Sequence, residues 1–170
     1  PSRTTILLVI TKVIMSTESS IDLPENNSCA FCAYLRGERD YTILSRTKNT
    51  ATFVTREQRG IPHVLVLPLR HVPSILELTD EEAAALGVEV RNAAALIDRA
   101  YSKPGISVWQ NNGVPAGQAI SHVHFHVAGT LEGGGTEFGP VEEISIAETD
   151  EIAERLLGPH LAIVKDGDHI

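Results

Sequence analysis

The chain has 170 residues, of which 42% are hydrophobic and 21% are charged, as expected of one globular domain. No stretch approaches the roughly 20 apolar residues that a bilayer span needs, so no membrane partner is expected. The formal net charge of -8 argues against binding of duplex nucleic acid, which requires a basic face, but not against a small phosphorylated ligand in a locally positive pocket.

The N-terminal sequence predicts a flexible extension over residues 1–28. Met15 is the single methionine, and we expect translation to start there, with residues 1–14 upstream of the native start. Residues 16–28 are rich in Ser, Thr, Glu, Asn and Pro, which is typical of an unstructured segment. The apolar run 6–14 is short and is not followed by a small-residue cleavage site, so a cytoplasmic location is the default expectation.

The first elements expected along the chain are short. Residues 29–36 predict a short helix that ends at Gly37. Three runs rich in β-forming residues follow and predict strands at 41–45, 50–55 and 63–69.

One long helix is expected in the middle of the chain. Thr79 and Glu82 have the spacing of a capping box, which predicts a helix over 80–101, ended by Lys103-Pro104-Gly105. Apolar residues at helical spacing predict its buried face: Ala83, Leu86, Val90, Ala94 and Ile97.

The remaining sequence predicts strands at 106–110 and 120–128, and then a C-terminal extension over residues 131–170. Within this extension, residues 149–157 predict a second short helix with Thr149 as its N-cap. Strands, one long helix and further strands together indicate an α+β fold with a largely antiparallel sheet.

Residues 122–126 read His-Val-His-Phe-His, and Val127 continues the alternation. In an extended chain the three imidazoles point to one face and the apolar residues point to the core. Because histidine titrates nearest neutrality, such an array suits proton transfer, phosphate contact, nucleophilic attack or metal binding. The alternative is a solvated strand face.

The two cysteines, Cys29 and Cys32, form a single Cys-x-x-Cys. This is a poor disulfide framework, but it has the spacing of two tetrahedral metal ligands. A site of that kind needs two more ligands from elsewhere in the chain. The alternatives are two reduced thiols packed in the core, or a redox pair.

Two blocks of the sequence resemble the histidine triad (HIT) superfamily of nucleotide hydrolases and transferases. Residues 122–128 match the superfamily motif His-φ-His-φ-His-φ-φ, where φ is apolar, and residues 111–118 supply the Asn and Gly-Gln that precede it. Residues 63–71 resemble the strand that ends in a Pro-x-x-His turn. The resemblance covers roughly residues 29–130. It implies a HIT domain with about five antiparallel strands, one long helix and short terminal helices, paired as a homodimer.

The resemblance also implies an activity. His124 would be the nucleophile that attacks the α-phosphate of a nucleoside phosphoramidate or a dinucleoside polyphosphate, through a nucleotidyl-histidine intermediate. His126 would contact the phosphate and stabilise charge in the transition state. The substrate-binding residues that it implies are Gln118, Asn111, Gly117, His63 and Thr55.

In zinc-bearing members of the superfamily the Cys-x-x-Cys is completed by the His of the Pro-x-x-His turn and by the first His of the triad. By this resemblance Cys29, Cys32, His71 and His122 form a structural Zn²⁺ site. Four protein ligands leave no open position on the metal, so His122 would serve structure and not chemistry.

The sequence departs from the family pattern at three places. Thr55 stands where the Hint branch carries an Asp that holds the ribose hydroxyls, Ala119 replaces a Ser or Thr that assists the leaving group, and residues 128–130 lack the common Pro-Arg. The first two departures leave open a second interpretation, a nucleotide-binding module with weak or lost catalysis. A third is a mononuclear metal enzyme that uses the triad as its ligands.

Overall fold

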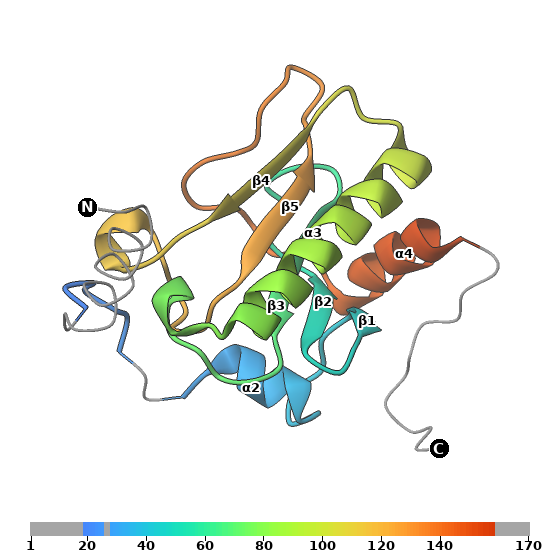
Figure 1. The fold of residues 1–170 in the computed structure, drawn as a ribbon. Coiled ribbons are helices and arrows are strands. Elements are labelled where there is room, and N and C mark those ends of the chain that lie inside the picture. The colour runs from blue at the N-terminus through green and yellow to red at the C-terminus, as the bar shows by residue number, and fades with distance from the viewer. Residues whose placement is uncertain (1–18, 26–27, 159–170) are drawn as a thin grey trace, which may run out of the picture.

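An antiparallel sheet of five strands, in the order β1-β2-β3-β5-β4, forms the centre of the fold (Figure 1). The computed structural model describes residues 19–25 and 28–158, so the expected start at Met15 lies outside the described residues. The strands are β1 (Ile43–Arg46), β2 (Thr50–Val54), β3 (His63–Pro68), β4 (Ile106–Gln110) and β5 (Phe125–Gly129). The α+β fold predicted from the sequence is confirmed.

Helices cover both faces of this sheet (Figure 1). One face carries the long helix, which contacts four of the strands, and the C-terminal helix beside it; the short N-terminal helix packs on the other face. The helices are α2 (Ala30–Leu35), α3 (Asp80–Tyr101) and α4 (Ile146–Leu157), with 3-10 turns η1 (Ile75–Glu77) and η2 (Val114–Ala116).

Helix α3 begins and ends as the sequence predicts. The Thr79 hydroxyl accepts a hydrogen bond from the Glu82 backbone N–H at 3.2 Å, and the Glu82 carboxylate accepts one from the Thr79 N–H at 2.9 Å. Leu86 and Ile97 are buried against the sheet. The prediction for Ala83 is wrong: it is exposed, because it lies in the first turn, one turn before the first buried residue of the helix.

Helix α4 starts three residues earlier than predicted. Its N-cap is Ser145, whose hydroxyl accepts from the Glu148 N–H at 3.2 Å while the Glu148 carboxylate accepts from the Ser145 N–H at 2.8 Å. Thr149 is therefore not the cap. It is buried inside the helix, where its hydroxyl donates to the Ile146 carbonyl at 2.8 Å and contacts the Thr42 hydroxyl at 2.6 Å.

The predicted strand over 120–128 is shorter than expected, because β5 begins only at Phe125. Continued backward, the β3–β5 register would place Pro68 opposite Val123, and proline has no N–H to donate. The Val123 N–H itself does not donate to a strand and instead donates to the Val72 carbonyl at 2.7 Å. Two of the three triad histidines thus lie in the segment that leads into β5.

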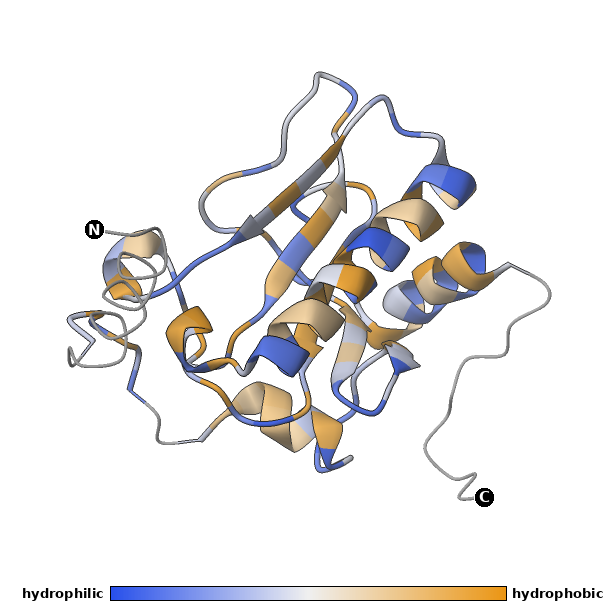
Figure 2. Cartoon of the chain, in the orientation of Figure 1, coloured by the Kyte–Doolittle hydropathy of each residue, from blue (hydrophilic) through white to orange (hydrophobic). Residues whose placement is uncertain are grey.

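The predicted alternation of faces survives this change. Val123 and Val127 are fully buried in the core cluster under α3. His124 and His126 face the opposite side of the sheet. Figure 2 shows that α3 and α4 each carry hydrophilic and hydrophobic residues, as amphipathic surface helices do. Within the described residues, no helix has the length and hydropathy that crossing a bilayer requires.

Two glycines provide a test of the packing. A Cβ at Gly129 would lie 2.5 Å from the Ile61 carbonyl oxygen, whereas a Cβ at Gly87, within α3, would meet nothing within 4 Å. We expect Gly129→Ala to lower the free energy of unfolding by about 1–3 kcal/mol through overpacking. Gly87→Ala should raise it by about 0.5–1 kcal/mol, because alanine loses less backbone entropy in a helix. Urea unfolding of both variants checks this, and changes of the same sign would contradict it.

Candidate functional site

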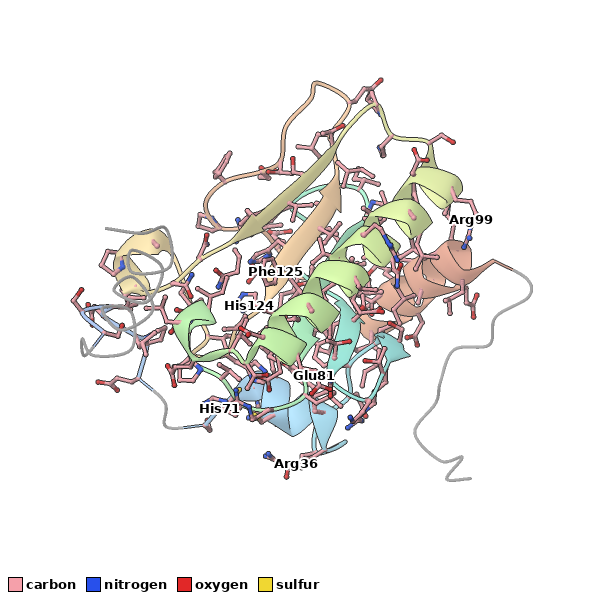
Figure 3. The ribbon with its side chains drawn as sticks, in the orientation of Figure 1. Arg36, His71, Glu81, Arg99, His124 and Phe125 are labelled. Carbon is pink, nitrogen blue, oxygen red and sulfur yellow. The ribbon has the colours of Figure 1, made fainter. Side chains whose placement is uncertain are left out.

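Four side chains with metal-ligating atoms meet beside α2, and His71 among them is seen in Figure 3. Cys29 is the N-cap of α2 and Cys32 lies in its first turn, while His71 follows β3 and His122 precedes β5. Their ligand atoms all lie within 4.8 Å of one another. The fold thus brings together the four residues that the sequence suggested as ligands, and this cluster could hold a metal ion.

The separations within this cluster suit a tetrahedral ion. The Cys29 Sγ lies 3.3 Å from Nδ1 of His122, and the Cys32 Sγ lies 3.6 Å from the same atom and 3.5 Å from Nδ1 of His71. Bonds of about 2.3 Å to sulfur and about 2.1 Å to nitrogen, at a tetrahedral angle, separate the two ligand atoms by about 3.6 Å. These three separations therefore fit a tetrahedral metal ion.

The protonation of these groups also favours a cation. The His122 Nε2–H donates to the Pro68 carbonyl at 2.9 Å, since a carbonyl oxygen only accepts, and this leaves the Nδ1 lone pair directed at the sulfur atoms. Burial lowers the pKa of His122 to about 4, so its ring is neutral. Burial and the neighbouring Cys29 raise the pKa of the Cys32 thiol to about 11, and a bound cation would oppose both effects by stabilising the thiolate.

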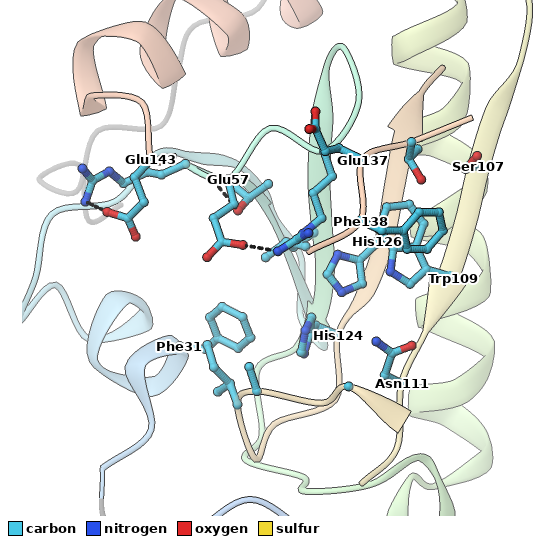
Figure 4. A pocket seen from close by; sticks show the side chains of 18 of the residues that line it. Phe31, Glu57, Ser107, Trp109, Asn111, His124, His126, Glu137, Phe138 and Glu143 are labelled. Carbon is cyan, nitrogen blue, oxygen red and sulfur yellow. Dashed lines mark hydrogen bonds and ion pairs between the residues drawn. The ribbon is translucent and has the colours of Figure 1, made fainter. Parts of the chain in front are cut away.

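A pocket of about 850 Å³ lies on the same face of the sheet (Figure 4). The Phe31 ring lies between it and the metal-ligand cluster, because its centroid is 5.7 Å from that of His122 and 5.0 Å from that of His124. Residues from the two ends of the described chain and from the sheet form the walls, among them Phe31, Tyr34, Tyr41, Thr55, Arg59, Trp109, Asn111, Gly117, His124, His126 and Phe138. Its size and its mixed aromatic and polar lining are those of a small-molecule site.

His124 is held in one tautomer. Its Nδ1–H donates to the backbone carbonyl of His122 at 2.7 Å, so Nε2 carries the lone pair. The residue is buried but lines the pocket, and burial lowers its pKa, which keeps the ring neutral. A neutral imidazole with a free Nε2 at a pocket is able to act as a nucleophile.

His126 belongs to a chain of two imidazoles. Nδ1 of His63 lies 2.9 Å from the Glu57 carbonyl and 3.3 Å from the Arg59 backbone nitrogen. Because the closer partner is a carbonyl oxygen, which only accepts, we assign the proton to Nδ1, and the His63 Nε2 then accepts from Nδ1 of His126 at 3.0 Å. The His126 Nε2 is left as an acceptor. Burial lowers the pKa of His63 to about 4 and that of His126 to about 2. Trp109 stacks on His126 with the ring planes 2° apart and the centroids 4.5 Å apart.

Of the five expected substrate-binding residues, Thr55, Asn111 and Gly117 line the pocket. Gly117 has φ +87, and a Cβ there would lie 3.5 Å from Nδ2 of Asn111, so a glycine keeps this rim free of strain and open. His63 is not in the lining; only 1% of it is exposed, behind His126.

Gln118 is also outside the lining, because its side chain holds the loop before the triad. Its Oε1 accepts from the Gly113 N–H at 2.7 Å, and its Nε2 donates to the carbonyls of Pro73 and Ile120 at 2.8 and 2.9 Å. The residue is buried and each of its amide hydrogens has a backbone partner. Here Gln118 positions the loop that carries Asn111 and Gly117.

Several lining residues are not predicted from the sequence. Phe31, Tyr34 and Tyr41 form an aromatic wall, in which the rings of Tyr34 and Tyr41 stack with centroids 4.2 Å apart. The presence of Phe31 between the two cysteines was the available signal for this wall. Nothing comparable marks Trp109 or Arg59, since an aromatic residue in a strand and an arginine in a turn are ordinary.

The family model described as the HIT domain matches residues 36–133. The fold and the spacing of the triad agree with this match, and the chain belongs to the HIT family.

Among the curated relatives whose names state an activity are two proteins of one yeast. The asymmetrical bis(5'-nucleosyl)-tetraphosphatase of Schizosaccharomyces pombe is 36% identical over 85 residues, which are 50% of this chain and 47% of that protein. The adenosine 5'-monophosphoramidase of the same organism is 32% identical over 100 residues, 59% of this chain and 72% of that protein. This chain thus spans about half the length of the first relative.

Among solved structures, a HIT-like protein of Bartonella henselae superposes with a TM-score of 0.71 and 21% identity, over 79% of this chain and 97% of that one. At this identity the likeness shows the fold.

The buried pair of His63 and His126 predicts that the folded protein loses stability in acid. The folded pKa values of about 4 for His63 and about 2 for His126 lie below that of an unfolded histidine, about 6.5. Because the fold favours the neutral rings, this stability is fully present above about pH 6.5 and is lost as the pH falls toward the folded values. Each group should contribute a slope of about 1.4 kcal/mol per pH unit to the free energy of unfolding.

Urea unfolding between about pH 7 and about pH 5, where most carboxylates stay ionised, measures this slope. His126→Asn should reduce the slope by about 1.4 kcal/mol per pH unit, which is the contribution of one titrating group. A variant whose slope equals that of the parent would contradict the assignment.

Proposed function

We propose that the protein is a nucleotide hydrolase or nucleotidyl transferase that attacks the α-phosphate of a nucleotide conjugate through His124. The observation that carries the proposal is the 2.7 Å hydrogen bond from the His124 Nδ1–H to the His122 carbonyl, which leaves Nε2 unprotonated at the pocket. The names of the two yeast relatives, which state hydrolysis of a dinucleoside tetraphosphate and of an adenosine phosphoramidate, support it.

In the first step, the Nε2 lone pair of His124 forms a bond to the α-phosphorus. The bond from phosphorus to the leaving group breaks, and the leaving group takes that electron pair. In the second step, water or an acceptor alcohol attacks the phosphorus, and the phosphorus–nitrogen bond returns its electrons to Nε2. The His126 Nε2, which is an acceptor, takes the proton of the attacking oxygen, because the negative phosphate beside it opposes the burial that lowers its pKa in the empty pocket, and the imidazolium so formed stabilises the phosphate charge.

The other pocket residues take supporting roles in this proposal. Asn111 and Gly117 face the phosphates at the rim, Thr55 meets the sugar, and the aromatic wall provides apolar surface for the base. His63 and Gln118, which have no place in the lining, act by holding His126 and the loop before the triad.

We further propose that the ion in the metal-ligand cluster is Zn²⁺, because two thiolates with two imidazoles in a tetrahedral arrangement are the ligand set that zinc prefers. With four protein ligands the ion would have a structural role. Cysteines that act as ligands must stay reduced, which favours the cytoplasm as the location of the protein.

We also propose a homodimer, in which the outer strand β4 offers the half-exposed Val108 on an unpaired sheet edge.

The second candidate function, a nucleotide-binding module without catalysis, has a specific observation in its favour. Ala119 and Thr55 both line the pocket, so the two positions where the family places a hydroxyl and a carboxylate lack these groups here. A comparison of the turnover rates of the parent and His124→Ala decides between the two functions.

Removal of the nucleophile tests the chemistry. His124→Ala should lower kcat by about a thousandfold or more on a dinucleoside polyphosphate or an adenosine phosphoramidate, because no other ring nitrogen in the pocket has the same position. Denaturation at alkaline pH, which preserves a phosphorus–nitrogen bond, should trap a nucleotide labelled at the α-phosphate on the parent protein and on His126→Asn, but not on His124→Ala. A parent no faster than His124→Ala on both substrates supports the binding module instead.

Metal analysis tests the zinc site. The purified parent should contain about one zinc per chain, and Cys32→Ala should lose it and unfold at a lower temperature, because metal binding and folding are coupled. The double variant His124→Ala, His126→Ala should keep the metal. Loss of zinc from the double variant, with retention in Cys32→Ala, would instead assign the metal to the triad and make the protein a mononuclear metal enzyme.

A further inference from the structure

One wall of the pocket comes from outside the matched family domain. Residues 136–144, which we call the strap, follow the last matched residue, 133, and contribute to the lining. The strap runs beside the connection between β2 and β3. The Glu137 N–H donates to the Arg59 carbonyl at 2.7 Å, and the Ile144 N–H donates to the Arg56 carbonyl at 3.0 Å.

Two arginine side chains in the pocket lining fasten the strap. The Arg56 guanidinium donates to the Ile144 carbonyl at 2.8 Å and pairs with Glu143 at 2.7 Å. The Arg59 guanidinium donates to the Gly139 carbonyl at 2.5 Å and pairs with Glu57 at 2.8 Å, an ion pair that is seen beside Glu57 in Figure 4. Both residues therefore hold the strap, but their surroundings differ.

Arg59 is the arginine whose charge acts on the triad. It contributes to lowering the pKa of both His63 and His126, after the larger effect of burial, and Arg56 does so for neither. A guanidinium has five N–H donors, and two of those of Arg59 have the partners described above, which leaves donors for a ligand.

Neutral donors also line the pocket, such as the Trp109 indole N–H beside His126 and the Asn111 amide, but they carry no charge. The His126 Nε2 is an acceptor, the Gln118 amide is bonded to backbone carbonyls, and Ala119 has no hydroxyl. Arg59 is thus the side chain best able to donate to negative charge on the His126 side of the pocket, and guanidinium groups bind phosphate through two parallel hydrogen bonds.

We propose that Arg59 binds a phosphate of the leaving group, so that the site prefers nucleotides whose α-phosphate is joined to a further phosphate over nucleotides whose α-phosphate is joined to an amine. This inference rests on the proposed function and names its substrate class. When the bond from the α-phosphorus to the bridging oxygen breaks, that oxygen keeps the electron pair and leaves as a phosphate anion, which Arg59 neutralises. An amine leaving group instead needs a proton, and Ala119 supplies none.

Arg59→Gln tests this proposal, with Arg56→Gln as the matched control, since both arginines line the pocket and hold the strap. The first measurement is calorimetric binding of adenosine mono- and diphosphate. The parent should bind the diphosphate at least about tenfold more tightly, as expected of one added charge-assisted contact. Arg59→Gln should remove this preference, while Arg56→Gln should keep it and Arg59→Lys should keep part of it.

The second measurement is the ratio of kcat/KM for a dinucleoside triphosphate to kcat/KM for an adenosine phosphoramidate. Arg59→Gln should lower this ratio about a hundredfold, the usual effect of removing one donor from a developing charge. If Arg59 only holds the strap, both substrates are affected equally, the ratio stays constant and the proposal is overturned.

Equal binding of the two nucleotides by the parent, or failure to bind either, also overturns the proposal. A diphosphate preference that depends on Arg59, in a protein that turns over neither substrate, supports the Arg59 contact and overturns the proposed hydrolase activity alone. The two failures are therefore distinguishable.

Discussion

His122 connects the metal-ligand cluster with the pocket, because it donates one hydrogen bond from its ring and accepts another at its backbone carbonyl. Its ring donates from Nε2 to the Pro68 carbonyl, which directs Nδ1 at the two cysteine sulfur atoms. Its own carbonyl accepts from Nδ1 of His124, which directs Nε2 of that ring at the pocket. A shift of this backbone would disturb the metal-ligand cluster and the tautomer of His124 together. A metal in the cluster would therefore stabilise the orientation of His124 at a distance, by fixing the position of the His122 carbonyl.

The sequence predicts most reliably where local chemistry and tertiary packing agree. The capping box of Thr79 and Glu82 places the start of α3 correctly because the hydrogen bonds are local and the helix is long. For α4 the same local pattern exists one turn before the predicted cap, Thr149, and the helix begins there, at Ser145 and Glu148. The backward limit of β5 depends on Pro68, which lies 55 positions before Val123 in the chain and opposite it only where the β3–β5 register is continued in the folded sheet, so no local pattern around the triad reveals it.

The site shows a similar division. The spacing of the Cys-x-x-Cys indicates two of the four metal ligands, and only the resemblance to zinc-bearing members of the superfamily adds His71 and His122. The roles of Gln118 and His63 are harder to predict, because a buried polar side chain must satisfy its own hydrogen bonds first. Withdrawal of the Gln118 amide toward a ligand would leave the Gly113 N–H without its acceptor, at a cost of about 1–3 kcal/mol. The strap is the least predictable part, because its contacts with Arg56 and Arg59 span about eighty residues of sequence.

The charge balance of the pocket follows from these contacts. The whole chain is acidic, with a net charge of -8, and each pocket arginine is paired with a glutamate. An ion pair with partners 23% and 46% exposed, such as that of Arg59 with Glu57, contributes at most about 1 kcal/mol to stability. A phosphate that replaces Glu57 as the partner of Arg59 would therefore displace little favourable energy, and it would gain a bidentate contact in a less hydrated place. In the absence of ligand, Glu57 keeps the guanidinium compensated and oriented, so that the cation stays at the pocket in an otherwise acidic protein.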